Sequence, residues 1–151
     1  MKEIPLVNSK GVALVDDDMY NFLVQWRWQA HPEGYVTRSE KRKTIGMHRV
    51  IMNPPIGMQV DHINHIKSDN QRANLRICTK AENMFNHPQA TGISGYRGVC
   101  QSKSAGKWDA YIKVNRKRIY LGTYADPIEA AVARDRAAMI HHGEFAILNF
   151  P

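Results

Sequence analysis

The stretch that decides the fold of the first half of the chain is residues 58–86, MQVDHINHIKSDNQRANLRICTKAENMFN. Met58-Gln59-Val60 is a short, largely apolar run that predicts a buried strand, and Asp61 and His62 follow it directly. Neighbouring side chains on a strand point to opposite faces. Asp61 and His62 therefore face one point only if the strand ends there.

The end of the same stretch predicts a short helix. Thr79-Lys80-Ala81-Glu82 has the capping-box pattern, in which a threonine hydroxyl and a glutamate carboxylate satisfy backbone donors at a helix start. The helix is expected over about residues 80–87, because Pro88 ends it. Asn83 and His87 are four residues apart and lie on the same helical face.

The chain before this stretch predicts a β-rich segment with two short helices. Asp16 and Asp17 precede a run typical of a short amphipathic helix. A second apolar segment, residues 47–52, ends where Asn53-Pro54-Pro55 forbids further helix. Strand-like runs separated by turn signals cover residues 3–7, 12–15, 35–39 and 44–47.

The second half predicts a three-stranded antiparallel sheet packed on one helix. Residues 89–95 are small and polar and make the best linker in the chain. A helix begins at Asp126-Pro127 and runs to Gly143. Its apolar stripe, which should lie on one face of the sheet, comprises Ile128, Ala131, Val132, Asp135, Ala138 and Met139. The strands cover residues 96–101, 107–115 and 117–123.

Composition narrows the class of protein. The 151 residues carry 21 Lys and Arg against 14 Asp and Glu, a formal net charge of +7 that favours a polyanionic partner. Cys78 and Cys100 are isolated, and the N-terminus has neither a basic region nor a long apolar run. We expect a reduced cytosolic protein without a signal peptide, membrane span or cysteine-based zinc site.

The excess positive charge is concentrated in one part of the second half. Between residues 97 and 118, Asp109 is the one acidic residue against seven cations. On paired strands such cations repel one another unless phosphates neutralise them. The pattern favours nucleic-acid binding over a solvated face. The seven cations are Arg97, Lys103, Lys107, Lys113, Arg116, Lys117 and Arg118.

The polar residues of the first half, from about 47 to 86, resemble the HNH homing-endonuclease family, in the branch whose last histidine is an asparagine. The resemblance rests on Val60-Asp61-His62-Ile63-Asn64, Asn74-Leu75-Arg76 and Glu82-Asn83, with Met47-His48-Arg49 upstream. It implies a ββα-metal module in which His62 polarises water as the general base, Asp61 holds the metal, and Asn74 fastens the loop and orients the histidine. The role of His48 stays open.

The chemistry of the side chains agrees with that implication. Cutting a phosphodiester requires an activated water, charge neutralisation at the phosphate and stabilisation of the leaving 3′ oxygen. Asp61 offers a hard anionic oxygen suited to one Mg²⁺ or Mn²⁺ ion, and Asn83 offers a neutral carbonyl oxygen as second ligand. His87 is a third candidate ligand.

The second half, from Tyr96 to the C-terminus, resembles the plant AP2 domain. The matching runs include Tyr96-Arg97-Gly98-Val99, Gly106-Lys107-Trp108 and Tyr120-Leu121-Gly122-Thr123-Tyr124. The resemblance implies a sheet whose exposed face lies in the DNA major groove, with contacts from Arg97, Trp108, Lys113, Arg118 and Tyr120. Cys100, Ser102 and Tyr111 depart from the plant pattern, so a target sequence does not transfer.

The predicted protein is α+β, with a nuclease module at 1–88, a linker at 89–95 and an AP2-like domain at 96–151. We expect a metal-dependent, site-selective endonuclease acting on duplex DNA as a monomer, with a dimer left open. By resemblance it is encoded by a phage or mobile element and acts in a bacterial or infected cytoplasm. The alternatives are a non-catalytic DNA-binding regulator and an RNA-binding accessory protein. Whether residues 1–46 form a scaffold or an extra DNA clamp stays open.

Overall fold

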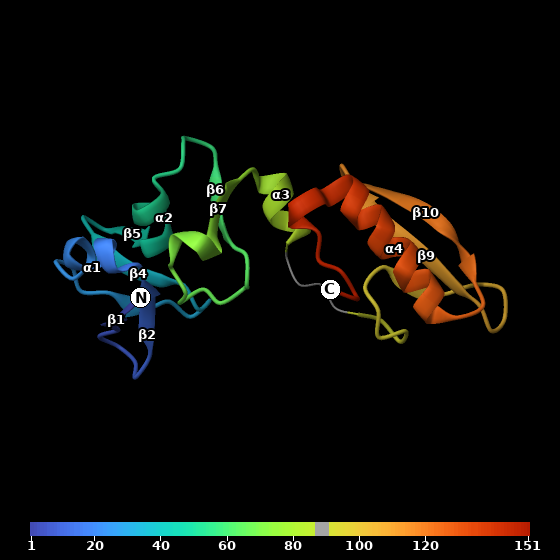
Figure 1. Cartoon of the computed structure of the whole chain (residues 1–151), viewed down its shortest axis with the longest axis horizontal. Coiled ribbons are helices and arrows are strands. Elements are labelled where there is room, and N and C mark those ends of the chain that lie inside the picture. The colour runs from blue at the N-terminus through green and yellow to red at the C-terminus, as the bar shows by residue number, and fades with distance from the viewer. Residues whose placement is uncertain (87–90) are drawn as a thin grey trace. The chain divides into compact units, whose positions relative to one another are not determined.

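The structure, a computed structural model, describes residues 1–86 and 91–151. Its backbone contacts divide the chain into two compact units, Met1–Lys80 and Ala81–Pro151. The first unit combines helices with three small antiparallel sheets and the second combines helices with one, so the predicted α+β class is confirmed (Figure 1). The predicted linker at 89–95 stays a prediction, because residues 89 and 90 lie outside the described part of the chain.

The first unit is built from short strands joined by tight turns. The strands form the sheets β1-β2, β3-β4-β5 and β6-β7, with antiparallel pairing throughout. The sequence pattern misses β3, which has only two residues, and β7, whose residues LRIC show no simple alternation. The elements are β1 (Lys2–Pro5), β2 (Val12–Val15), α1 (Asp17–Leu23), β3 (Gln29–Ala30), β4 (Val36–Glu40), β5 (Lys43–Gly46), α2 (Met47–Met52), β6 (Gln59–His62), a 3₁₀ turn (Arg72–Asn74) and β7 (Leu75–Cys78).

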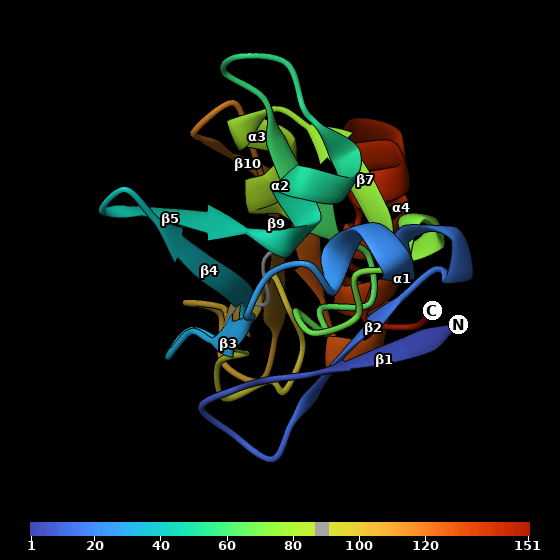
Figure 2. The same ribbon diagram turned by 90° about the vertical axis from the view of Figure 1, so that its left-hand side faces the viewer.

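The core of the first unit lies between β1, β2, β4 and the helices α1 and α2. Leu23, Trp28 and Met47 are fully buried in it. The indole N–H of Trp28 donates to the Leu23 carbonyl at 2.8 Å, which satisfies a polar group that would otherwise be costly to bury. Figure 2 shows the β4–β5 turn reaching away from α1 and α2.

The long loop between β6 and β7 is fastened to β2. The Leu14 amide donates to the Ser68 carbonyl at 2.9 Å, and the Asn70 amide donates to the Leu14 carbonyl at 2.8 Å. The Arg72 amide donates to the Asp16 carboxylate at 2.9 Å. The loop that follows His62 is therefore held against the rigid core of its own unit.

The second unit packs α4 on one face of a three-stranded sheet with the order β10-β9-β8 (Figure 1). Asp126 caps α4 by accepting from the Ile128 amide at 2.7 Å, and Pro127 occupies the first turn, as predicted. The elements are α3 (Lys80–Phe85), β8 (Val99–Gln101), β9 (Trp108–Val114), β10 (Lys117–Tyr124), α4 (Pro127–His142) and a 3₁₀ turn (Gly143–Phe145). No helix in the described ranges is long and apolar enough to cross a lipid bilayer.

The face of α4 that meets the sheet is formed by small side chains. Alanines at positions 130, 131, 137 and 138 are buried, whereas Ile128 and Met139, which belong to the predicted stripe, are exposed. Alanines let the helix and the sheet approach closely. The larger apolar side chains of α4 lie on a different face of the helix. The predicted stripe is therefore correct only in part.

A buried polar cluster ties the C-terminal tail to α4. The Asp135 carboxylate accepts from the backbone amides of Asn149 at 2.6 Å and Phe150 at 3.0 Å, and from Arg134 at 3.1 Å. Gly98 lies beside this cluster with a φ of +74°, and a Cβ there would come within 2.5 Å of the Tyr111 carbonyl oxygen. Only glycine fits that position without displacing the backbone.

Candidate functional site

Asp61 and His62 end β6 in buried positions. They are 8% and 4% exposed, and the β6–β7 register places Asp61 opposite Arg76 and His62 opposite Leu75. The Asp61 carboxylate accepts from Nε and Nη2 of Arg76 at 2.9 and 2.8 Å. Because both N–H groups converge on Oδ2, the pair holds the carboxylate in one orientation.

The His62 ring belongs to a cluster of three rings from separate segments. The ring centroids of His62 and His48 are 5.3 Å apart, and Tyr35 lies 5.2 Å from His48 and 6.0 Å from His62. Gly46 makes room for this arrangement, because a Cβ there would lie 2.6 Å from Cε1 of His48. The cluster supports one edge of the His62 ring with packed side chains.

Burial keeps both histidines in their neutral form at neutral pH. It lowers the pKa of His48 to about 4, with further contributions from the charges of His62 and Arg49. Burial also lowers the pKa of His62, while a hydrogen bond with Asn70 and the Asp61 carboxylate act in the opposite direction. A neutral imidazole has a nitrogen that is able to accept a proton.

Asn74 fastens the β6–β7 loop by hydrogen bonds to its backbone. Its side-chain oxygen accepts from the Asn64 amide at 2.9 Å, and its side-chain nitrogen donates to the Asp69 carbonyl at 2.8 Å. Asn64 also donates from its side chain to the Asp69 carboxylate at 2.9 Å. Asn70, four residues before Asn74, forms a side-chain hydrogen bond with His62.

A pocket of about 180 Å³ opens beside the ring cluster. Tyr35, Thr37, His48 and Arg49 contribute to its wall, together with Thr44, Gly46, His31 and Glu33. Within the described ranges, the buried Thr37 hydroxyl and Nδ1 of His48 have no hydrogen-bond partner. The surface of the pocket is mainly apolar, because these two polar atoms are buried beneath it.

The structure describes part of the predicted set of metal ligands. Asn83 is half-buried on α3, whereas His87 lies outside the described residues. Among the residues that the structure describes, no three His, Cys, Asp or Glu side chains are grouped to hold a metal ion. The predicted set of one carboxylate and one amide oxygen does not require such a group, and both donors are hard oxygens of the kind that Mg²⁺ prefers.

The face of the second sheet opposite α4 carries aromatic and cationic side chains. The Arg118 guanidinium stacks on the Tyr111 ring at 3.6 Å from its centroid, and the Tyr120 ring lies 5.4 Å from that of Tyr111. Tyr120 and Thr123 share a hydrogen bond of 2.7 Å, and Thr123 donates to Asp109. The strand register sets these pairs, because Tyr120 lies opposite Tyr111 and Arg118 opposite Lys113.

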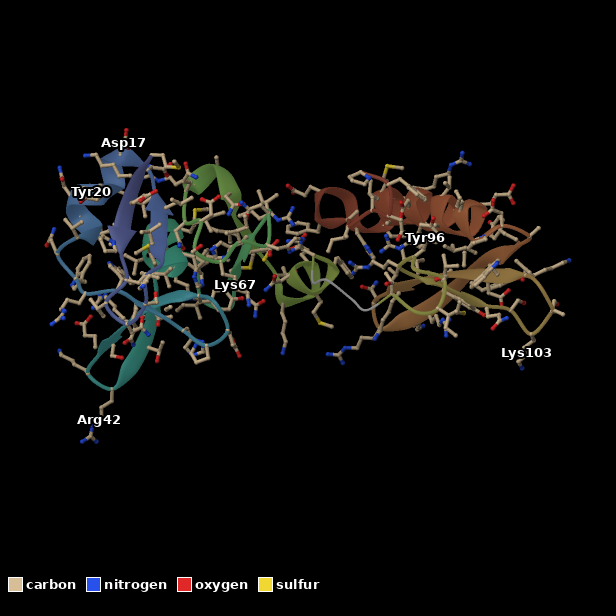
Figure 3. The ribbon with its side chains drawn as sticks, turned by 90° about the horizontal axis from the view of Figure 1, so that it is seen from below. Asp17, Tyr20, Arg42, Lys67, Tyr96 and Lys103 are labelled. Carbon is tan, nitrogen blue, oxygen red and sulfur yellow. The ribbon has the colours of Figure 1, made fainter. Side chains whose placement is uncertain are left out.

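Most of the residues predicted to bind DNA are exposed at this sheet or its turns. Lys113, Arg118 and Tyr120 lie on the strands, and Arg116 lies in the β9–β10 turn. Lys103 and Lys107 lie in the loop between β8 and β9, where Figure 3 shows Lys103 pointing away from the sheet. The structure therefore brings six of the predicted positions to accessible sites: 103, 107, 113, 116, 118 and 120.

Arg97 and Trp108 differ from this group. Arg97 is 8% exposed, donates to the Phe85 carbonyl at 3.1 Å, and has a pKa lowered to about 10 by burial and by Arg134. Trp108 packs against the apolar core beneath α4. Arg97 precedes β8, which starts only at Val99, and Trp108 lies opposite Tyr124 on the α4 side of the sheet.

Sequence reasoning missed several residues that surround the site. Arg76 pairs with Asp61, Asn70 interacts with His62, and Tyr35 packs on both histidines. The signal for Arg76 was available in principle, because a second strand paired with β6 brings a residue opposite Asp61. Tyr35 lies too far away in sequence for any spacing argument to find it.

One segment of the chain matches a known protein family. Residues 46–85 match the family model described as HNH endonuclease, which confirms the predicted run from about 47 to 86. The match contains the ring cluster residue His48, the pair Asp61 and His62, and α3 up to its last residue.

Individual relatives belong to two groups. An AP2-like ethylene-responsive transcription factor of Arabidopsis thaliana is 33% identical over 102 residues, which cover 66% of this chain and 28% of the relative. A second ethylene-responsive transcription factor of that plant is 44% identical over 75 residues, covering 48% and 38%. An HNH endonuclease of Acanthamoeba polyphaga mimivirus is 29% identical over 104 residues, covering 64% and 55%.

The chain thus has an HNH plus AP2-like architecture, as predicted. It spans between about a quarter and two fifths of the length of the two plant relatives named above.

Proposed function

We propose that this protein is a metal-dependent DNA endonuclease, in which the HNH-like run from about residue 47 to 86 cuts a phosphodiester bond and the sheet of the second unit binds duplex DNA. The observation that carries the proposal is the end of β6. Asp61 and His62 are adjacent and buried there, yet Asp61 is held by Arg76 while His62 packs against Tyr35 and His48. The two groups are oriented by different partners and therefore suit two different tasks: Asp61 suits metal binding and His62 suits proton transfer.

His62 acts as the general base. Its lowered pKa leaves the imidazole neutral near pH 7, so it accepts a proton from water as the oxygen attacks phosphorus. The new bond joins the water oxygen to phosphorus, and the bond from phosphorus to the 3′ oxygen breaks. Tyr35 and His48 hold the ring in position, and Asn74 keeps the loop that follows it closed.

A divalent cation, Mg²⁺ or Mn²⁺, supplies charge neutralisation at the phosphate and stabilises the leaving oxygen when bound. Asp61 and Asn83 are its proposed ligands, with His87 as a further candidate. In the absence of a cation, Arg76 balances the charge of Asp61.

The test is nicking of supercoiled plasmid DNA by the intact chain with Mg²⁺ or Mn²⁺, with EDTA as control. His62→Ala should lower the rate by roughly 10²- to 10⁴-fold and leave DNA affinity unchanged, because it removes the base alone. His141→Ala replaces an exposed histidine on α4 and should cut at the normal rate. Products that appear equally fast with His62→Ala would reject His62 as the base.

The second candidate function is a DNA-binding regulator without catalysis. It is favoured by the sheet face around Arg118, which is complete within the second unit. DNA binding without cleavage, across several metals and host or phage substrates, would establish the regulator in place of the nuclease.

A further inference from the structure

The turn between β4 and β5 presents three successive cations to solvent. Lys41, Arg42 and Lys43 are all exposed, and Figure 3 shows Arg42 at the end of the hairpin, pointing outward. Glu40, the acid next to them, is paired with Arg38. Three like charges in sequence repel one another unless an anion neutralises them, so the turn favours a polyanionic partner.

The backbone of this turn makes the choice of residues unusual. Glu40 pairs with Lys43, which leaves Lys41 and Arg42 as a two-residue loop with φ values of +47° and +65°. Loops of this kind favour Asn-Gly or Asp-Gly, because side chains other than glycine and asparagine are strained at positive φ. Lys41 and Arg42 occupy the two positions where long side chains are least favourable. This choice indicates that they serve a function other than forming the turn.

The base of the hairpin leads to the candidate active site. Thr37 on β4 and Thr44 on β5 contribute to the wall of the pocket that also contains His48 and Arg49. The ring of His48 in turn contacts that of His62. At about 3.3 Å per residue, the turn lies roughly 13 Å from Gly46 along β5. A DNA backbone that passes beside His48 and His62 is therefore within reach of the turn.

We propose that the β4–β5 hairpin is a DNA-binding element of the first unit, whose turn binds the phosphate backbone of duplex DNA beside the bond that is cut. This inference rests on the proposed nuclease function. The second unit contains a similar hairpin, since its β9–β10 turn is Asn115-Arg116 with φ values of +48° and +65°. The hairpin of the first unit binds phosphate without reading bases, because its turn offers only flexible cations.

The test replaces the turn by the residues its backbone prefers. Lys41→Asn/Arg42→Gly in the full chain removes two charges and relieves strain, so its melting temperature should equal or exceed that of the parent. The dissociation constant for a duplex, measured in EDTA, should rise about 5- to 10-fold. The slope of log K against log salt should become shallower by about 2, at roughly 0.9 per lost phosphate contact.

Lys10→Gln/Arg27→Gln is the matched control, because it removes two exposed cations of the same unit outside the hairpin. A turn variant that matches this control in affinity and salt slope would overturn the inference. An equal loss for single-stranded RNA would overturn the assignment to duplex DNA. Binding is measured in EDTA, so this test does not depend on cleavage. If the nuclease function alone fails, the turn variant still has a shallower salt slope than the parent, and the parent does not nick plasmid DNA.

Discussion

The two units place their candidate functional side chains in opposite surroundings. In the first unit, Asp61 and His62 are less than a tenth exposed, and burial sets the protonation state of the histidines. In the second unit, Arg118 lies over Tyr111 on an open sheet face, where it is exposed to solvent. Burial suits a group that must exchange a proton, whereas exposure suits a group that must bind a polyanion.

The second unit also contains a buried ion pair, and its role is structural. Asp135→Ala should destabilise the protein by about 3–5 kcal/mol, because it leaves Arg134 buried without its partner and removes the acceptor for two tail amides. Chemical denaturation followed by circular dichroism measures this loss. Asp126→Ala removes only the exposed helix cap and should cost about 1 kcal/mol. Equal losses in the two variants would show that the buried cluster contributes no more than a surface cap.

Acid should destabilise the first unit through His48. The pKa of His48 is about 4 in the folded chain and near 6.5 when unfolded, so the unfolded state binds more protons between these values. Stability is therefore fully present above about pH 6.5 and falls as the pH drops toward 4, by on the order of 1–3 kcal/mol. Urea unfolding at pH 7 and pH 4.5 measures the difference.

His48→Phe keeps an aromatic ring without a titrating group and should flatten this pH dependence. If the variant loses stability in acid as steeply as the parent, another group is responsible for the loss.

The smallest expected effect concerns the open sheet face. Arg118→Gln should weaken duplex binding about 5- to 10-fold and make the salt slope shallower by about 1, without a change in melting temperature. Fluorescence anisotropy at several salt concentrations measures both quantities. Arg118→Lys should restore only part of the affinity, because lysine does not stack on the Tyr111 ring as guanidinium does.

Arg97→Gln is the counterpart of Arg118→Gln in a buried position. It should lower the melting temperature and leave DNA affinity unchanged once the protein is folded, because the Arg97 guanidinium is buried and donates to the Phe85 carbonyl. A loss of affinity as large as that of Arg118→Gln would return Arg97 to the DNA-binding surface that the AP2 resemblance implies.

Local sequence patterns were sufficient to predict most elements of both units. Proline positions, the cap at Asp126 and the alternation along β9 act over a few residues, so they are readable without a fold. The same holds for Asp61 and His62 as candidates, since their position at a strand end follows from the run before them. The architecture of the chain was predicted for the same reason, because its motifs are local.

The tertiary structure alone decided which side chains meet. Tyr35 and His48 pack on His62 because separate segments fold onto one another, and Arg76 reaches Asp61 through the register of β6 with β7, a strand that the sequence pattern missed. Arg97 resembles a DNA contact in sequence, yet it is buried beside α4 because β8 begins only after Gly98. Whether a charge serves catalysis, binding or packing depends on its burial, and burial is a property of the whole fold.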